Sequence, residues 1–176
     1  MRVLYSEFMK IRRFSMTIFY IIIAIVIAFF AYGREKTWTL FFGQADMGTV
    51  DFATLVPSKK PNSALFCPED YCPNAERKSP SPIFDMPAAT LKDKLFSIIN
   101  AEPHIVQVAN DVQNHEYRFV QYTPLMRYPD TIRIKIIQLN DNQSTLAIFS
   151  ESQIGRSDLS VNYKRINGWM DILEAQ

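Results

Sequence analysis

The chain has little glycine, cysteine or histidine, and no excess of one charge. Its 176 residues include five glycines, none of them in a phosphate-binding loop, and only two histidines. His104 and His115 have no recognisable catalytic or metal-binding partner. The formal net charge is +1 and the pI is near 7.7, so the chain lacks the excess of basic residues that is typical of nucleic-acid-binding domains. We therefore expect no metal, no cofactor and no nucleic-acid partner, and these counts do not indicate an enzyme.

Charge is also absent from one long stretch, FSMTIFYIIIAIVIAFFAY at residues 14–32. At about 1.5 Å per residue, a helix of this length crosses a hydrocarbon core of about 30 Å. The competing interpretation is a cleavable signal peptide, but the apolar region of a signal peptide is usually only about 7 to 15 residues long. We expect a retained transmembrane helix over residues 14–33 that anchors the chain in a lipid bilayer.

Basic residues flank this stretch unequally. Residues 1–13 contain four of them, and residues 34–36 contain two. The positive-inside rule then assigns residues 1–13 to the cytoplasm and the chain from Gly33 onward to the outside. The sequence predicts a single-pass protein of the bacterial inner (cytoplasmic) membrane with a periplasmic C-terminal domain. The alternative is an organellar inner membrane, with the first residues interpreted as an import signal.

The two cysteines, Cys67 and Cys72, lie in the stretch CPEDYCP. Four intervening residues do not fit the C-x-x-C redox motif, and no second ligand pair is spaced to complete a zinc site. A disulfide that closes a small loop in an oxidising compartment is the simplest interpretation. It agrees with a domain outside the cytoplasm.

Two segments of different composition follow the anchor. Residues 34–50 are expected to form a juxtamembrane linker, whose aromatic side chains either lie along the membrane surface or contact the domain. Residues 51–86 contain six of the ten prolines, so we expect an extended, irregular segment that either has a function of its own or wraps the domain. Residues 87–176 are expected to form the globular domain.

Regular periodicity begins at Pro87, a favourable first residue for a helix. Apolar residues at helical spacing follow it, and then four strand-like stretches occupy residues 104–110, 117–123, 131–139 and 144–152. A last helix is expected from Ser157 or Asp158 onward, with Leu159, Tyr163, Ile166, Met170 and Leu173 as its buried stripe. The predicted fold class is α+β, in the order α-β-β-β-β-α. The four strands are expected to form an antiparallel meander sheet flanked by two helices on one face.

Polar residues are dense around the start of that last helix. On a helix, Asp158, Asn162 and Arg165 fall on one stripe, which Trp169 continues, while two serines share a face of the preceding strand. These residues form the candidate site for a ligand or a partner: Ser150, Ser152, Gly155, Ser157, Asp158, Asn162, Arg165 and Trp169.

The candidate site has two interpretations. In the structural one, Ser157 or Asp158 is the N-cap of the helix, and Arg165 pairs with Asp158 or Glu151. In the functional one, the helix start binds an anion or a lipid headgroup, with Arg165 as its partner.

Several stretches resemble the domain of unknown function 1499 family, in particular its alphaproteobacterial-type, membrane-anchored members. They are DFATL, CPEDYCP, PIFDMPAATL, RFVQYTPLMRYPDTI and LAIFSESQIGRSDLSVNYKRINGW. The most specific motif is S-x-S-x-x-G-x-S-D-x-x-x-N-x-x-R, which runs from Ser150 to Arg165. The chain differs from the family at Glu151, where many members have arginine, and at Ser160, where glycine is frequent. The resemblance implies a membrane-associated bacterial envelope protein and implies no activity.

Three functions remain open at this point. The first is a non-enzymatic accessory or assembly subunit that contacts another membrane protein. The second is a module that binds a lipid or another amphiphile in a groove between the sheet and the last helix, lined by Leu146, Ile148 and Phe149. The third is a serine hydrolase that uses Ser152 or Ser157 with Asp158, although the sequence offers no convincing base.

Overall fold

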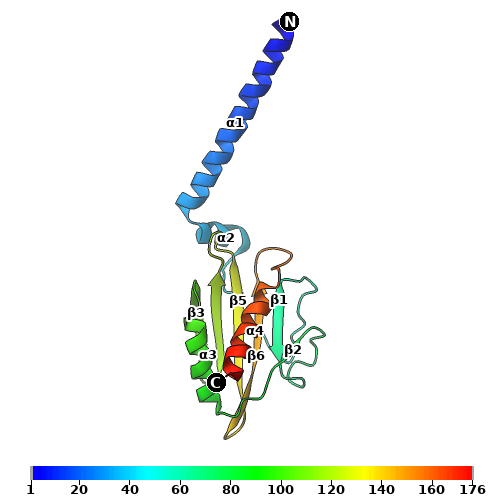
Figure 1. Ribbon diagram of the computed structural model, residues 1–176, viewed down its shortest axis with the longest axis vertical. Coiled ribbons are helices and arrows are strands. Elements are labelled where there is room, and N and C mark those ends of the chain that lie inside the picture. The colour runs from blue at the N-terminus through cyan, green and yellow to red at the C-terminus, as the bar shows by residue number, and fades with distance from the viewer. Residues whose placement is uncertain (1, 176) are drawn as a thin grey trace. The chain divides into compact units, whose positions relative to one another are not determined.

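The computed structural model describes residues 2–175, without the side chains of residues 2–8 and 11. Two compact units follow one another along the chain: an N-terminal helical unit that ends at Gly43, and a domain that begins at Gln44 (Figure 1). The domain contains a single sheet and the helices α3 (Ala88–Asn100) and α4 (Val161–Glu174).

The N-terminal unit consists of α1 (Arg2–Tyr32) and α2 (Arg34–Phe42). Gly33 separates the two helices at a φ of 106°, a conformation that a side chain would disfavour. Within α1, Arg12–Tyr32 has a mean hydropathy of 2.6, and by length and composition it is a candidate membrane span. Of the candidate anchor expected at residues 14–33, residues 14–32 therefore lie in one continuous helix, and the first part of the expected linker is helical as well.

The sheet has six strands in the order β2-β1-β6-β5-β4-β3. Their bounds are β1 (Ser63–Cys67), β2 (Ser79–Pro80), β3 (Ile105–Asp111), β4 (Glu116–Tyr122), β5 (Pro129–Asn140) and β6 (Gln143–Ser152). Strands β3 to β6 form an antiparallel meander, and β1 pairs antiparallel with β6. Strand β2 runs parallel to β1, so the sheet is mixed.

The prediction of a four-stranded antiparallel sheet is therefore wrong, although the α+β class is confirmed. Both additional strands come from residues 51–86, for which the six prolines had predicted an irregular segment. The stretch SALFC lies between those prolines, and four of its five residues are buried as β1. In this position β1 covers the edge of β6, whose unpaired backbone groups would otherwise face water.

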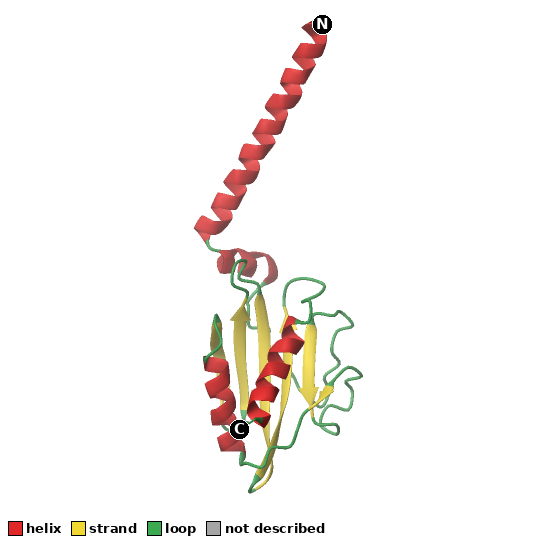
Figure 2. Ribbon diagram, in the orientation of Figure 1, coloured by secondary structure: helices red, strands yellow, loops and turns green. Residues whose placement is uncertain are grey.

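Both helices of the domain cover the same face of the sheet, as predicted (Figure 2). The core on that face contains Leu91 and Leu95 from α3, Ile166 and Trp169 from α4, and three isoleucines of β5, Ile132, Ile134 and Ile136. The alternation of isoleucines with Arg133 and Lys135 along β5 explains this arrangement, because successive side chains point to opposite faces.

The other face of the sheet is covered by the chain that enters the domain. Thr131 Oγ1 donates a hydrogen bond of 2.8 Å to the carbonyl of Ala45, and Arg133 Nε donates one of 2.7 Å to the carbonyl of Gly48. Phe52 then packs into a second apolar cluster. This cluster includes Cys67 and Cys72, which form the predicted disulfide.

Helix α4 begins at Val161, three to four residues later than predicted. Leu159 and Ser160 precede it in the left-handed conformation, with φ of 55° and 64°, which ends any helix that would start at Ser157 or Asp158. As a result Leu159 lies outside the helix and is exposed, and Tyr163 is exposed as well. The predicted buried stripe holds for Ile166, Met170 and Leu173.

Candidate functional site

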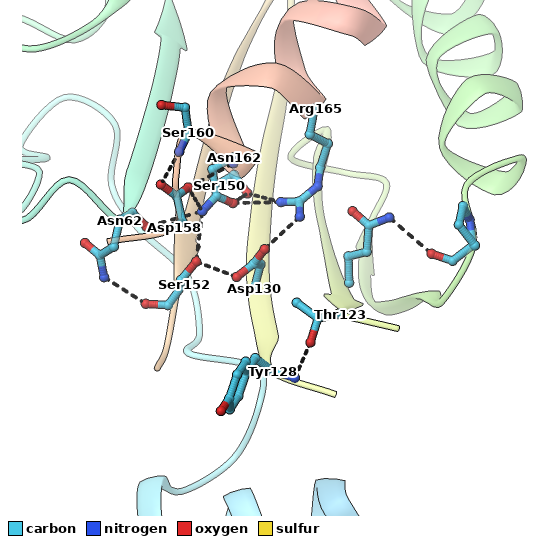
Figure 3. A network of polar contacts seen from close by, with 12 residues as sticks. Asn62, Thr123, Tyr128, Asp130, Ser150, Ser152, Asp158, Ser160, Asn162 and Arg165 are labelled. Atoms are coloured by element: carbon cyan, nitrogen blue, oxygen red, sulfur yellow. Dashed lines mark hydrogen bonds and ion pairs between the residues drawn. The ribbon is translucent and has the colours of Figure 1, made fainter. Parts of the chain in front are cut away.

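The candidate site lies at the end of the sheet where β5 begins and β6 ends. Here the first turns of α4 pass over two paired residues, Asp130 of β5 and Ser152 of β6. Figure 3 shows that Ser150, Ser152, Asp158, Asn162 and Arg165 converge at this point, from β6, the following loop and α4. Five of the eight predicted residues therefore meet in one network.

Asn162 is the centre of this network and is fully buried. Its Oδ1 accepts hydrogen bonds from the Ser150 hydroxyl and from Arg165 Nη1. Its Nδ2 lies 2.6 Å from Asp158 Oδ2, 3.0 Å from Ser152 Oγ and 3.2 Å from the carbonyl of Asn62. A buried amide is stable only when its donors and acceptor are satisfied, and here both ends of the group have partners.

Arg165 forms a buried ion pair with Asp130. Its Nη2 lies 2.7 Å from Asp130 Oδ2, and the two side chains are only 8% and 6% exposed. The other oxygen of Asp130 accepts a hydrogen bond of 2.5 Å from the Ser152 hydroxyl. Arg165 Nη1 also donates to Ser150 Oγ at 2.9 Å. The guanidinium is thus held against the sheet, and neither predicted partner, Asp158 or Glu151, pairs with it.

Asp158 caps the helix, although it is not the N-cap residue itself. Its Oδ1 accepts from the backbone N–H of Ser160 at 3.0 Å, and its Oδ2 accepts from the backbone N–H of Asn162 at 2.9 Å. These bonds satisfy a backbone N–H in the first turn of α4, which has no partner within the helix. The predicted structural role of Asp158 is therefore present, but it acts from a position two residues before the N-cap.

Asn62 connects the network to the chain before β1. The Ser152 backbone N–H donates to the Asn62 carbonyl at 2.9 Å, and Asn62 Nδ2 donates back to the Ser152 carbonyl at 3.0 Å. The backbone N–H of Asp158 donates to the carbonyl of Pro61 at 3.2 Å. The network therefore fixes the loop before β1, the end of β6 and the start of α4 to one another.

Three predicted residues lie outside the network. Ser157 is exposed, and its hydroxyl accepts only from the backbone of Leu159 at 3.3 Å. Gly155 has a φ of 102° and supplies the turn that the loop requires. Trp169 lies in the core, where its Nε1 donates to Glu102 Oε1 at 3.0 Å. It follows Arg165 by one turn on the same side of α4, but at this level the helix packs on the apolar core and not on the polar end of the sheet.

The network consists of hydrogen bonds among its own members, and Asn62 Oδ1 is its one side-chain oxygen that is buried without a partner among the described residues. The Ser152 hydroxyl donates to a carboxylate that Arg165 already holds, and no histidine is among the partners of Ser150 or Ser152. This arrangement gives no support to a serine nucleophile. No group of three potential metal ligands occurs among the residues that the structure describes.

Sequence reasoning missed two members of the network, Asp130 and Asn62. In the sequence Asp130 only follows Pro129 before a strand-like stretch, whereas the pairing of β5 with β6 puts it directly opposite Ser152. Asn62 belongs to the segment that was expected to be irregular. Knowledge of the strand register would have identified Asp130, but nothing in the sequence pattern points to Asn62.

The groove that was expected between the sheet and the last helix does not have the predicted lining. Leu146 and Ile148 are fully buried in the core beneath α3 and α4. Phe149 points to the opposite face and belongs to the second apolar cluster. None of the three is available to line an open groove.

The comparisons with known proteins agree with the motifs of this region. The family model described as "Protein of unknown function (DUF1499)" matches residues 57–173, which include the complete network. No curated protein and no solved structure matches the chain.

Proposed function

The chain belongs to the DUF1499 family, and we propose that it is a membrane-anchored, non-enzymatic accessory subunit that docks on another membrane protein. The proposed docking surface consists of three loops, residues 56–62, 123–128 and 153–160, which we name the basic loop end. All three leave the sheet where β5 begins and β6 ends, because Ser63 pairs with Glu151 and Tyr122 pairs with Pro129.

The basic loop end combines exposed apolar side chains with positive charge. Val56, Leu125 and Leu159 are 72%, 67% and 81% exposed. The three loops contain four basic residues, Lys59, Lys60, Arg127 and Arg156, and a single acid, Asp158, which belongs to the network. The turn between α3 and β3 at the same end adds Glu102, so this end has an excess of two basic side chains. Such a surface is complementary to a partner with an apolar patch and surrounding carboxylates.

The opposite end of the sheet has the opposite charge. Three connections at that end, residues 83–87, 111–115 and 140–143, contain Asp85, Asp111 and Asp141 and no lysine or arginine. This asymmetry gives the domain one basic and one acidic end, which favours docking in a single orientation.

The polar network is the observation that carries the proposal. It fixes the loop before β1 and the loop before α4 through Asn62, Asp158 and Asn162. In the remaining loop, residues 123–128, the backbone N–H of Tyr128 donates to Thr123 Oγ1 at 2.9 Å (Figure 3). Exposed apolar side chains on fixed loops lose little conformational entropy on binding, which suits a protein interface. A fluid lipid surface would not require loops held in this way.

The test is site-specific photo-crosslinking in intact membranes. A photoreactive residue replaces Leu159 or Leu125, and the matched control replaces Val112, which is exposed at the acidic end. We expect one discrete protein adduct from Leu159 and Leu125 and none from Val112. The adduct should be lost in a Lys59→Glu/Lys60→Glu/Arg156→Glu variant. Adducts that are equally strong at Val112, or that resist the charge reversal, would contradict the proposal.

The proposed location is the periplasmic side of a bacterial inner membrane. The disulfide supports an oxidising compartment, and the basic residues before Phe14 support a cytoplasmic N-terminus. Both cysteines are in the disulfide, so an introduced cysteine is the only free thiol. A membrane-impermeant maleimide should label Ser157→Cys in intact spheroplasts and Ser6→Cys only after permeabilisation. The reverse pattern would contradict this orientation.

A further inference from the structure

One face of helix α2 is aromatic. Trp38, Phe41 and Phe42 occupy positions i, i+3 and i+4, which lie on the same side of a helix. The rings of Trp38 and Phe42 are neighbours, with 6.2 Å between their centroids. Phe41 is 70% exposed, and none of the residues 34–42 is buried. An aromatic helix face that lies outside the protein core indicates an interaction surface.

The position of α2 relative to α1 is set by Gly33 and by an aromatic contact. Gly33 has a φ of 106°, so α1 ends at Tyr32 and the chain changes direction before α2 (Figure 1). The Trp38 ring then packs edge-on against the Phe29 ring, with 5.2 Å between the ring centroids. Phe29 is three residues before Tyr32, which is about 4.5 Å from the end of α1 along its axis. The Trp38 ring therefore lies beside the last turn of α1 and not beyond it.

The candidate span Arg12–Tyr32 gives this contact a depth in the membrane. At about 1.5 Å per residue the span is about 30 Å long, so it matches the hydrocarbon core of a bilayer. Its last turn then lies about 15 Å from the bilayer centre, where the headgroups begin. Trp38, held beside that turn, lies where tryptophan is enriched in membrane proteins. The Arg34 Cζ atom is 5.5 Å from the centroid of the Phe30 ring, and the headgroup layer accepts both the charge and the rings.

We infer that α2 is an interfacial helix, and that its face with Trp38 and Phe41 binds the headgroup layer of the bilayer that α1 crosses. Phe41 is three residues from Trp38, so along the helix it lies within about 5 Å of the same level in any orientation of α2. A helix that continued straight from α1 would instead place Phe41 nine residues beyond Tyr32, about 14 Å farther from the bilayer centre and outside the headgroups.

An interfacial helix adds apolar contact area to an anchor that has a single span, and it holds the end of that span at one depth. The inference rests on the proposed anchoring by α1. It does not depend on the partner that the domain binds, because α2 and the basic loop end can be changed separately.

The test is a depth measurement by electron paramagnetic resonance on the full-length protein in vesicles of phosphatidylethanolamine and phosphatidylglycerol. A nitroxide is attached to one introduced cysteine at a time, since both native cysteines are in the disulfide. The label at Phe41→Cys should lie about 15–20 Å from the bilayer centre. The matched control is Leu40→Cys, which is 71% exposed on the opposite face of α2 and should lie farther out. Ile22→Cys, in the middle of the span, should lie near the bilayer centre, and Val112→Cys of the domain should lie in water.

These positions separate a failure of the inference from a failure of the anchor. A Phe41 label in water, with the Ile22 label inside the hydrocarbon, would overturn the inference alone. A Phe41 label that neither oxygen nor a nickel complex reaches would also overturn it, because the side chain would then pack on protein. An Ile22 label outside the hydrocarbon would refute the anchoring by α1 and the inference with it.

A pair of charge substitutions tests which face of α2 meets the lipid. With the label at Thr39→Cys, Phe41→Asp should shift the label away from the bilayer centre, because a carboxylate is costly where the ring met the lipid. Leu40→Asp adds the same charge on the opposite face and should leave the depth of the label unchanged. Equal depths in the two variants would contradict the assignment of the aromatic face to the lipid surface.

Discussion

Replacing Arg165 by methionine tests whether the polar network holds the domain together. The substitution removes the guanidinium that lies 2.7 Å from Asp130 and leaves that carboxylate buried without its counter-ion. Breaking a buried ion pair from one side typically costs about 3–5 kcal/mol. The hydrogen bonds from Arg165 to Ser150 and Asn162 are lost as well. Since a small domain is stable by about 5–15 kcal/mol, Arg165→Met should remove a large part of that free energy.

The assay is thermal unfolding of the full-length protein in detergent, followed by the near-ultraviolet signal of the domain. A loss of about 3–5 kcal/mol corresponds to a melting temperature lower by roughly 10–20 °C for a domain of this size. The neighbouring substitution Lys164→Met is the matched control, and it should change stability by less than about 0.5 kcal/mol because Lys164 is exposed. The double variant Arg165→Met/Asp130→Ala should lose less free energy of unfolding than the two single variants lose together. A loss below about 1 kcal/mol for Arg165→Met would refute the view that this pair is structural.

Three further predictions concern the rest of the domain. Asn162→Ala should cost about 2–4 kcal/mol in urea unfolding, since it leaves several buried partners unsatisfied, whereas Asn167→Ala on the exposed side of α4 should cost less than about 0.5 kcal/mol. Burial alone would raise the pKa of Asp46, but hydrogen bonds from Arg118 and from a backbone N–H hold that pKa below its usual value. Ionised Asp46 therefore stabilises the folded domain above about pH 4, and this stabilisation is lost as the pH falls further. In Asp46→Asn the free energy of unfolding should depend less on pH in this acid range than in the wild type. Serine at both cysteines should lower the free energy of unfolding by about 2 kcal/mol, as expected for so short a loop, and a reductant should then have no further effect.

Together these predictions separate the two roles that the last helix was given. If Arg165 and Asn162 are structural, their loss reduces stability and loosens the basic loop end. The exposed side chain of Leu159, by contrast, should affect docking without affecting stability. The buried polar network therefore positions the loops, and the exposed side chains of the basic loop end are available for contact.

Local patterns in the sequence were sufficient for much of the fold. The alternation of Ile132, Ile134 and Ile136 with basic residues identified β5 because it depends only on neighbours along one strand. The uninterrupted apolar stretch before Gly33 identified the N-terminal helix for the same reason. The spacing of Cys67 and Cys72 restricted their chemistry to a short disulfide loop.

Features that depend on pairing between distant segments could not be obtained in this way. The strand Ser63–Cys67 is short and surrounded by prolines, and only its contact with β6 reveals that it belongs to the sheet. The start of α4 was misplaced because Leu159 continues the apolar spacing, while its left-handed backbone is set by the hydrogen bonds of Asp158.

The sequence by itself determined that an apolar N-terminal helix precedes an α+β domain, and it grouped eight residues around the start of the last helix, of which the structure brings five into one network. These conclusions depend on periodicity and spacing, which are local properties of the chain. Only the tertiary structure decided that Asp130 is the partner of Arg165, because two residues 35 positions apart meet through the register of β5 with β6 and the packing of α4 above it. Burial then determines their role, since a charge removed from water must have its counter-ion close by.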